Sequence, residues 1–205
     1  MEWSILVVAF LVGAVPFGYI VPKLARGIDI RTVGSGNPGF TNVYRAVGTG
    51  PGLVVLLADI GKGIAAVLLG RAFGGGALPV VAGVAAIAGH IGTPFLRFRG
   101  GKGVATAAGV FITLLPLETA ICLALFALVV GLSRYVSLGS VVAAVGLPIA
   151  VVVVARARDG ALPTYELIVA ALVAVIIVLR HRDNLRRLFA GEENRFSFHR
   201  RGGNE

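Results

Sequence analysis

The chain has 205 residues, of which 57% are hydrophobic and 14% are charged, and its mean hydropathy is +0.89. Soluble domains contain about 45–50% apolar and about 25% charged residues, so this composition excludes an ordinary soluble domain. It predicts one polytopic membrane domain over residues 1–205, with the lipid bilayer as a partner. The net charge of +9 is typical of cytoplasmic loops that face anionic lipid, and we expect no nucleic-acid partner.

The first apolar run, residues 3–22, carries no charge and is long enough to cross a bilayer. Lys23 and further basic residues follow this run instead of preceding it. This order predicts a retained helix with its N-terminus outside, because a cleaved secretory signal has its basic residues before the apolar run. Pro16 lies within the run as a kink point that a membrane helix tolerates.

The second span begins near Pro51 and ends by Leu69. Asp59 and Lys62 lie within it, three residues apart and therefore on one helix face. Charges inside a span are costly unless they are paired. Two interpretations stay open: a structural ion pair, or a support that holds neighbouring phosphate-binding loops.

Further apolar runs cover residues 78–92, 104–133, 136–155 and 167–179. Pro116 interrupts the second of these runs, which fits either one kinked helix or a hairpin of two shorter helices. The hairpin gives seven spans and puts 15 of the 19 Lys and Arg residues on the cytoplasmic side. A single helix would instead put the arginine-rich C-terminal segment opposite the glycine-rich loops.

We therefore predict an all-α integral membrane protein with seven transmembrane helices, its N-terminus outside and its active-site loops on the cytoplasmic face. Residues 194–205 are predicted to form a flexible cytoplasmic tail. In this topology four polar segments end on one face, where they can form one site. They are residues 34–45, 97–103, 134–140 and 180–193.

Two of these segments are rich in glycine: residues 34–39 read Gly-Ser-Gly-Asn-Pro-Gly, and residues 100–103 read Gly-Gly-Lys-Gly. Glycine lets backbone N–H groups turn towards a ligand, and successive N–H groups form an anion-binding nest. Because Arg45 and Lys102 add positive charge, the pattern predicts phosphate binding. The first segment reads G-x-G-x-x-G but lies between membrane spans, without the βαβ unit of a dinucleotide-binding fold. The second segment is not a P-loop, because Gly103 stands where a P-loop has Ser or Thr.

Histidines stand near two of the polar segments. His90 ends a span, where a packing role and a catalytic role are both open. His181 lies among arginines and shares a helix face with Asn184, and its role is equally open. Residues 182–189 combine arginines with Leu and Phe at helical spacing, which is typical of an interfacial helix on anionic lipid.

Taken together, these segments resemble the bacterial acyl-phosphate:glycerol-3-phosphate acyltransferase family, and the resemblance covers nearly the whole chain in order. Phe40 departs from the pattern, since the family usually has alanine there. Three blocks carry the resemblance: Gly34-Ser35-Gly36-Asn37-Pro38-Gly39 with Thr41, Asn42 and Arg45; Gly89-His90 with Phe95-Leu96 and Gly100-Gly101-Lys102-Gly103-Val104-Ala105-Thr106; and Arg180-His181 with Asn184, Arg187-Leu188, Gly191 and Glu193.

The resemblance implies transfer of a fatty acyl group from a long-chain acyl phosphate to the 1-hydroxyl of sn-glycerol 3-phosphate. The products would be lysophosphatidic acid and inorganic phosphate, in the first acylation step of bacterial phospholipid synthesis. It also implies the bacterial cytoplasmic (inner) membrane as the location, and neither a cofactor nor a metal. The sequence leaves the acyl-chain preference and the oligomeric state open.

We assign Lys102 and the surrounding amides to the leaving acyl phosphate, and the other catalytic residues to glycerol 3-phosphate. The expected catalytic residues are Ser35, Arg45, Lys102, His181 and Asn184. The expected substrate-binding residues are Gly36, Asn37, Thr41, Asn42, His90, Gly100, Gly101, Gly103, Ser140, Arg180 and Glu193.

The sequence offers no Ser-His-Asp or Cys-His set for a covalent intermediate, and its single cysteine, Cys122, is expected to be a packing residue. An acyl phosphate is already activated, so positioning and charge stabilisation suffice. The hydroxyl proton can go to a substrate phosphate, whose second pKa is about 6, or to His90 or His181. The rival class is a transporter or channel for an anionic solute, whose site would lie near the bilayer midplane.

Overall fold

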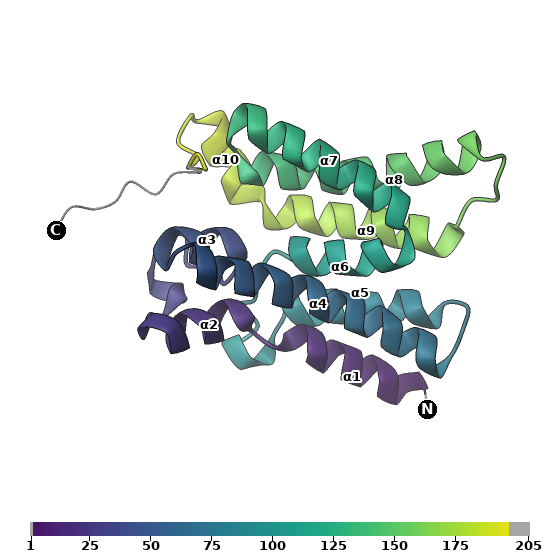
Figure 1. Ribbon diagram of the computed structural model, residues 1–205, viewed down its shortest axis with the longest axis horizontal. Helices are drawn as coiled ribbons and strands as arrows, with labels where there is room; N and C mark the ends of the chain where they lie inside the picture. Colours follow the sequence, from purple (N-terminus) through teal and green to yellow (C-terminus); the bar gives the residue numbers. More distant parts are fainter. Residues whose placement is uncertain (1, 197–205) are drawn as a thin grey trace.

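The computed structural model describes residues 2–196, and this part of the chain contains helices and connecting turns but no β-strand. The predicted all-α fold is confirmed (Figure 1). The elements in chain order are α1 (Glu2–Ala14), α2 (Phe17–Arg26), the 3-10 helix η1 (Ile30–Thr32), α3 (Phe40–Ala46), α4 (Thr49–Phe73), α5 (Leu78–Ile91), the 3-10 helix η2 (Pro94–Leu96), α6 (Val104–Leu114), α7 (Pro116–Ser133), α8 (Val136–Ala157), α9 (Thr164–Arg180) and α10 (Arg182–Phe189).

The first apolar segment is broken at Pro16, between α1 and α2. Proline has no N–H to donate and its ring crowds the preceding turn, so the helix ends before it and the carbonyls of Ala14 and Val15 lack the partners that a continuous helix would supply. The Thr93 hydroxyl donates to the Ala14 carbonyl at 2.6 Å, and Lys62 Nζ donates to the Val15 carbonyl at 3.2 Å. The break is therefore tied both to α4 and to the turn that follows α5.

Five segments are long and apolar enough to cross a membrane: Trp3–Arg26, Thr49–Phe73, Leu78–Leu96, Pro116–Ser133 and Val136–Ala157. The bent pair α9–α10, with 57° between its two helices, makes a sixth if it is counted as one span. α6 is apolar but has 11 residues, so it is about 16 Å long, against about 30 Å for a bilayer core. The count of seven spans and the outside N-terminus stay predictions.

Residues 104–133 form a hairpin, one of the two arrangements that the sequence allows. α6 and α7 meet at Leu115 and Pro116 and run in opposite directions (Figure 1). Pro116 is the first residue of α7, where its missing N–H costs no intrahelical hydrogen bond.

The helices form two groups, with α1 to α5 in one, α7 to α9 in the other and α6 between them (Figure 1). α6 approaches α4 closely, because a Cβ at Gly63 would overlap the Thr106 carbonyl and one at Gly109 would overlap the Ile60 carbonyl. A buried apolar cluster then joins the two groups through residues of α4 to α9, including Val67, Phe111, Val151 and Val173.

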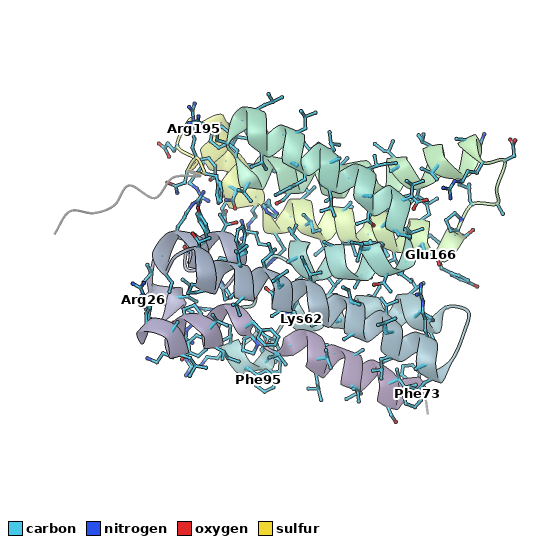
Figure 2. The ribbon with its side chains drawn as sticks, viewed as in Figure 1. Arg26, Lys62, Phe73, Phe95, Glu166 and Arg195 are labelled. Atoms are coloured by element: carbon cyan, nitrogen blue, oxygen red, sulfur yellow. The ribbon has the colours of Figure 1, made fainter. Side chains whose placement is uncertain are left out.

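The polar loops gather at one end of the bundle. α2, α3 and α10 lie at this end in Figure 1, and Figure 2 places the side chains of Arg26 and Arg195 there, with Phe73 and Glu166 at the opposite end. Between the two ends, large apolar side chains such as Leu57, Val153 and Leu172 are more than half exposed, as expected for a surface that faces lipid.

Candidate active site

All four polar segments contribute to one cavity of about 350 Å³. Its polar end holds Ser35, Arg45, Lys102, Ser137 and Asn184, which come from α3 and its preceding loop, the loop before α6, α8 and α10. Away from these groups the cavity continues between helices along apolar residues, among them Phe111, Cys122, Leu147, Val173 and Ile177. A polar pocket and an apolar channel are therefore one continuous space.

The cavity brings together most of the residues that the sequence predicts for the site. The predicted residues that line it are Ser35, Asn37, Thr41, Asn42, Arg45, His90, Lys102, Gly103, Ser140, His181, Asn184 and Glu193. The predicted residues that do not line it are Gly36, Gly100, Gly101 and Arg180. Cys122 is 6% exposed, which fits the packing role expected for it.

The first glycine-rich loop is folded by the side chain of Asn42, which is 6% exposed. Its Oδ1 accepts a hydrogen bond from the Ser35 N–H at 3.1 Å, and its Nδ2 donates to the Val33 carbonyl at 2.9 Å. Gly34 and Gly36 have φ of 60° and 68°, in the left-handed region that side chains disfavour. Asn42 therefore acts by shaping the loop that presents Ser35 to the cavity.

Lys102 belongs to a hydrogen-bonded chain across the polar end. Its Nζ donates to Asn184 Oδ1, and Asn184 Nδ2 donates to Glu193 Oε1 at 2.7 Å. Ser137 Oγ donates to the same Glu193 oxygen at 2.9 Å, and Arg187 Nε donates to Oε2 at 2.9 Å. The chain links the loop before α6 with α8, α10 and the segment after α10.

Their surroundings shift the pKa values of two charged groups in this hydrogen-bonded network, Lys102 and Glu193. Burial lowers the pKa of Lys102 to about 8, with the positive charges of Arg187 and Arg180 acting in the same direction and Glu193 opposing them. Burial alone would raise the pKa of Glu193, but the hydrogen bonds from Asn184, Ser137 and Arg187 outweigh it and hold that pKa below its usual value. Lys102 is therefore mostly charged at neutral pH and Glu193 fully charged.

The residues after α10 fold back over the site. Arg45 Nη2 donates to the Asn194 carbonyl at 3.0 Å, and the Phe196 N–H donates to the Arg134 carbonyl at 2.6 Å. The Phe196 ring stacks on Tyr44 with centroids 4.8 Å apart. The first residues of the predicted tail thus contact the helical body, whereas residues 197–205 lie outside the described part and the prediction of flexibility is untested there.

The two histidines have different positions. The Nδ1 atom of His181 lies 2.8 Å from the Ile177 carbonyl. A carbonyl only accepts, so Nδ1 carries the proton and Nε2 is left for the cavity. His90 has its Nδ1 3.6 Å from Asp59 Oδ1, and its ring packs against Gly101. Ser140 Oγ donates to the Val136 carbonyl of its own helix at 2.8 Å.

Three further residues line the cavity that the sequence does not predict for the site: Ser137, Arg187 and Asn194. Arg187 follows Asn184 by three residues, a spacing that puts both on one helix face and that signals a shared role. The contribution of the Asn194 backbone carbonyl has no sequence signal. Within residues 2–196, no three His, Cys, Asp or Glu side chains are grouped so that they can hold a metal ion.

The fold and the site define a polytopic helical membrane protein with a cavity that joins a cationic polar end to an apolar channel. A family model described as glycerol-3-phosphate acyltransferase matches residues 3–191. The chain therefore belongs to the glycerol-3-phosphate acyltransferase family, and it is an acyltransferase, as the sequence predicts.

Individual relatives agree with this assignment. The chain is 51% identical over 139 residues to glycerol-3-phosphate acyltransferase 2 of Moorella thermoacetica, an alignment that covers 68% of this chain and 72% of that one. It is 52% identical over 136 residues to the glycerol-3-phosphate acyltransferase of Desulforudis audaxviator, covering 66% and 69% of the two chains.

Two solved structures share the fold. Both are of PlsY (YgiH), described as an integral membrane glycerol 3-phosphate acyltransferase. Its glycerol 3-phosphate form has a TM-score of 0.87 at 35% identity over 96% of each chain, and its lysophosphatidic acid form has a TM-score of 0.85 at 34% identity over 96% of this chain and 95% of that one. The chain is accordingly a multi-pass membrane protein.

Proposed function

We propose that this chain transfers a long-chain acyl group from acyl phosphate to the 1-hydroxyl of glycerol 3-phosphate, and releases lysophosphatidic acid and inorganic phosphate. The observation that carries the proposal is the continuity of the cavity, which joins cationic groups at one end to an apolar channel between α6, α7, α8 and α9. An acyl phosphate has the same division into an anionic head and an apolar tail. The names of the relatives support glycerol 3-phosphate as acceptor.

The apolar channel suits the acyl tail, and the polar end suits the two phosphates. Lys102 and Gly103 line the same cavity as the apolar residues of the channel, so in the proposed reaction the Lys102 ammonium stabilises the charge that develops on the leaving phosphate. Ser35, Arg45, His181 and Asn184 surround the remaining space and hold glycerol 3-phosphate with its hydroxyl towards the acyl carbon.

In the chemical step, the 1-hydroxyl oxygen bonds to the acyl carbonyl carbon, and the bond from that carbon to the phosphate oxygen breaks. The phosphate leaves with the bonding electron pair, and the hydroxyl proton passes to a phosphate oxygen. His90 is a poor candidate for the base, because its ring is occupied by Asp59 on one side and Gly101 on the other. His181 Nε2 is the rival proton acceptor.

We further propose that the polar end of the cavity lies at the cytoplasmic face of the bacterial inner membrane, with seven spans and the N-terminus outside. The concentration of arginine and lysine in the segments at this end supports that orientation.

Purified protein in detergent tests the proposal, with glycerol 3-phosphate and a synthetic long-chain acyl phosphate as substrates. We expect lysophosphatidic acid and inorganic phosphate to form in equal amounts, and Lys102→Ala to lower kcat/KM at least about 100-fold, comparable to the loss of one oxyanion-hole donor. The exposed Arg158→Ala is the matched control at the opposite end. Activity with another acyl donor but not with acyl phosphate would contradict the proposed donor, and solute movement only across sealed vesicles would favour a transporter.

A further inference from the structure

A group of buried polar side chains lies beside the glycine-rich loop at residues 100–103, and two of its members, Asp59 and His90, also line the cavity. Asp59 and Lys62 from α4, His90 from α5 and Thr93 after α5 are each 7% exposed or less. Figure 2 labels Lys62 near the middle of α4, between the two ends of the bundle. Charged and polar groups buried this deeply are costly unless each has a partner. We therefore identify the partner of each side chain in the group.

Two members of the group have structural partners. The Thr93 hydroxyl and Lys62 Nζ donate to the carbonyls that the break at Pro16 leaves exposed. Lys62 also pairs with Asp59, with its Nζ 2.8 Å from Oδ1. These contacts account for Lys62 and Thr93 as groups that hold α1 in place, but they do not account for His90.

His90 joins Asp59 to the glycine-rich loop. Its Nδ1 lies 3.6 Å from the Asp59 oxygen that also faces Lys62. On its other side the ring presses on the backbone of Gly101: a Cβ there would overlap Nε2 and come within 2.8 Å of Cε1 and 3.2 Å of Cδ2. All three of the nearest atoms belong to the His90 ring, so the ring is the surface on which this part of the loop rests.

The same stretch of backbone has further partners on α9 and α5. Arg180 Nη2 donates to the carbonyls of both Gly100 and Gly101, at 3.1 Å each. The Gly100 N–H donates to the Ile91 carbonyl at the end of α5, at 3.0 Å. The two residues immediately before Lys102 are therefore clamped between α5 and α9, which fixes where the Lys102 side chain enters the cavity.

We propose that His90 is a positioning residue for Lys102: with the Asp59 carboxylate facing its Nδ1, the imidazole supports the Gly100–Gly101 backbone from α5 while Arg180 holds it from α9. This inference rests on the proposed role of Lys102 in charge stabilisation. It assigns His90 to the loop rather than to substrate binding, and it gives Asp59 a place against the support of a phosphate-binding loop in addition to its ion pair with Lys62.

Kinetics of single and double variants test the proposal. The variants are His90→Ala, His90→Gln, Gly101→Ala and the double variant that combines His90→Ala with Gly101→Ala. Gly61→Ala is the matched control, because a Cβ at Gly61 meets nothing within 4 Å. Gly101 lies outside the left-handed region, so the alanine methyl conflicts with the His90 ring and not with the backbone conformation.

We expect His90→Ala to lower kcat about 10- to 100-fold while the KM of glycerol 3-phosphate stays within about threefold, because a displaced Lys102 loses stabilisation of the transition state rather than of bound substrate. His90→Gln should retain at least about fivefold more kcat than His90→Ala. The double variant should fall no more than about threefold below His90→Ala, because the methyl of Gly101→Ala no longer meets the ring.

Hydrogen–deuterium exchange of the peptide covering residues 97–104 supplies a readout that needs no acyl donor. The amides of this loop should exchange faster in His90→Ala than in wild type and Gly61→Ala. Unchanged loop exchange, or single-variant losses that multiply in the double variant, would overturn the proposal. If His90→Ala does not fold, His90→Gln and Gly101→Ala give the same comparison. If the wild type does not use acyl phosphate, the proposed identity of the acyl donor is wrong. The hydrogen–deuterium exchange result then still decides whether His90 positions the loop.

Discussion

The pH dependence of acyl transfer should report the charge of Lys102 directly. Burial lowers the pKa of this lysine from 10.5 to about 8, which corresponds to about 3 kcal/mol against its charged form. The charged form is the active one, so activity is present below the pKa and is lost as the pH rises through it. With a pKa of about 8, about 90% of the molecules carry the charge at pH 7 and about 10% at pH 9.

We therefore expect kcat/KM to be nearly constant from pH 6.5 to 7.5 and to fall about tenfold between pH 7 and pH 9. A bound phosphate favours the ammonium, so the corresponding fall in kcat should occur at a higher pH than that in kcat/KM. The assay is release of inorganic phosphate by purified protein, with spontaneous hydrolysis of the acyl phosphate subtracted at each pH.

Lys102→Arg is the informative variant, because a guanidinium stays charged throughout this range. Its activity will be lower, since arginine does not reproduce the contact with Asn184, but the alkaline fall should disappear. A wild-type profile that stays flat to pH 9.5, or an unchanged alkaline fall in Lys102→Arg, would refute the assignment of the charge to Lys102.

Two further predictions concern stability and acyl-chain preference. Lys62→Met leaves Asp59 buried without its ion-pair partner and should destabilise the protein by about 3–5 kcal/mol; thermal unfolding in detergent checks this, and a midpoint equal to that of the exposed control Lys23→Met would contradict it. Ala144→Leu extends into the apolar channel and should displace about two methylenes of a long acyl chain, worth about 0.8 kcal/mol each. Long-chain donors should then lose about tenfold or more in kcat/KM relative to shorter ones, whereas the outward-facing control Val145→Leu should not change the preference.

The fold class and the meeting of the polar segments follow from the sequence because both depend on strong, local signals. Long uncharged runs predict membrane helices wherever they occur, and glycine beside Arg45 and Lys102 indicates anion binding without knowledge of the tertiary structure. α6 shows where this reasoning ends: its 11 residues are apolar but short, and packing against Gly63 of α4, which no local pattern reveals, sets its position.

The roles of individual side chains within the site could not be predicted from such local sequence signals. Asn42 and Arg180 sit in motifs that suggest substrate contact, yet their side chains hold backbone groups of their own or a neighbouring loop. Such hydrogen bonds join residues far apart in the chain, and a single sequence contains no record of which distant carbonyl a donor meets. Glu193 is similar, since its three partners come from α8 and α10.

The central claim is that four distant polar segments meet on one membrane face, and site-directed labelling tests it most directly. In a Cys122→Ala background, single cysteines replace the exposed residues Arg26, Arg99, Arg134 and Arg186 at the polar end, and Gly75 and Arg158 at the other end. With a membrane-impermeant maleimide, we predict that the first four react only in inside-out vesicles and the last two only in right-side-out vesicles. Labelling of Arg186→Cys from the side opposite to Arg26→Cys would contradict the account.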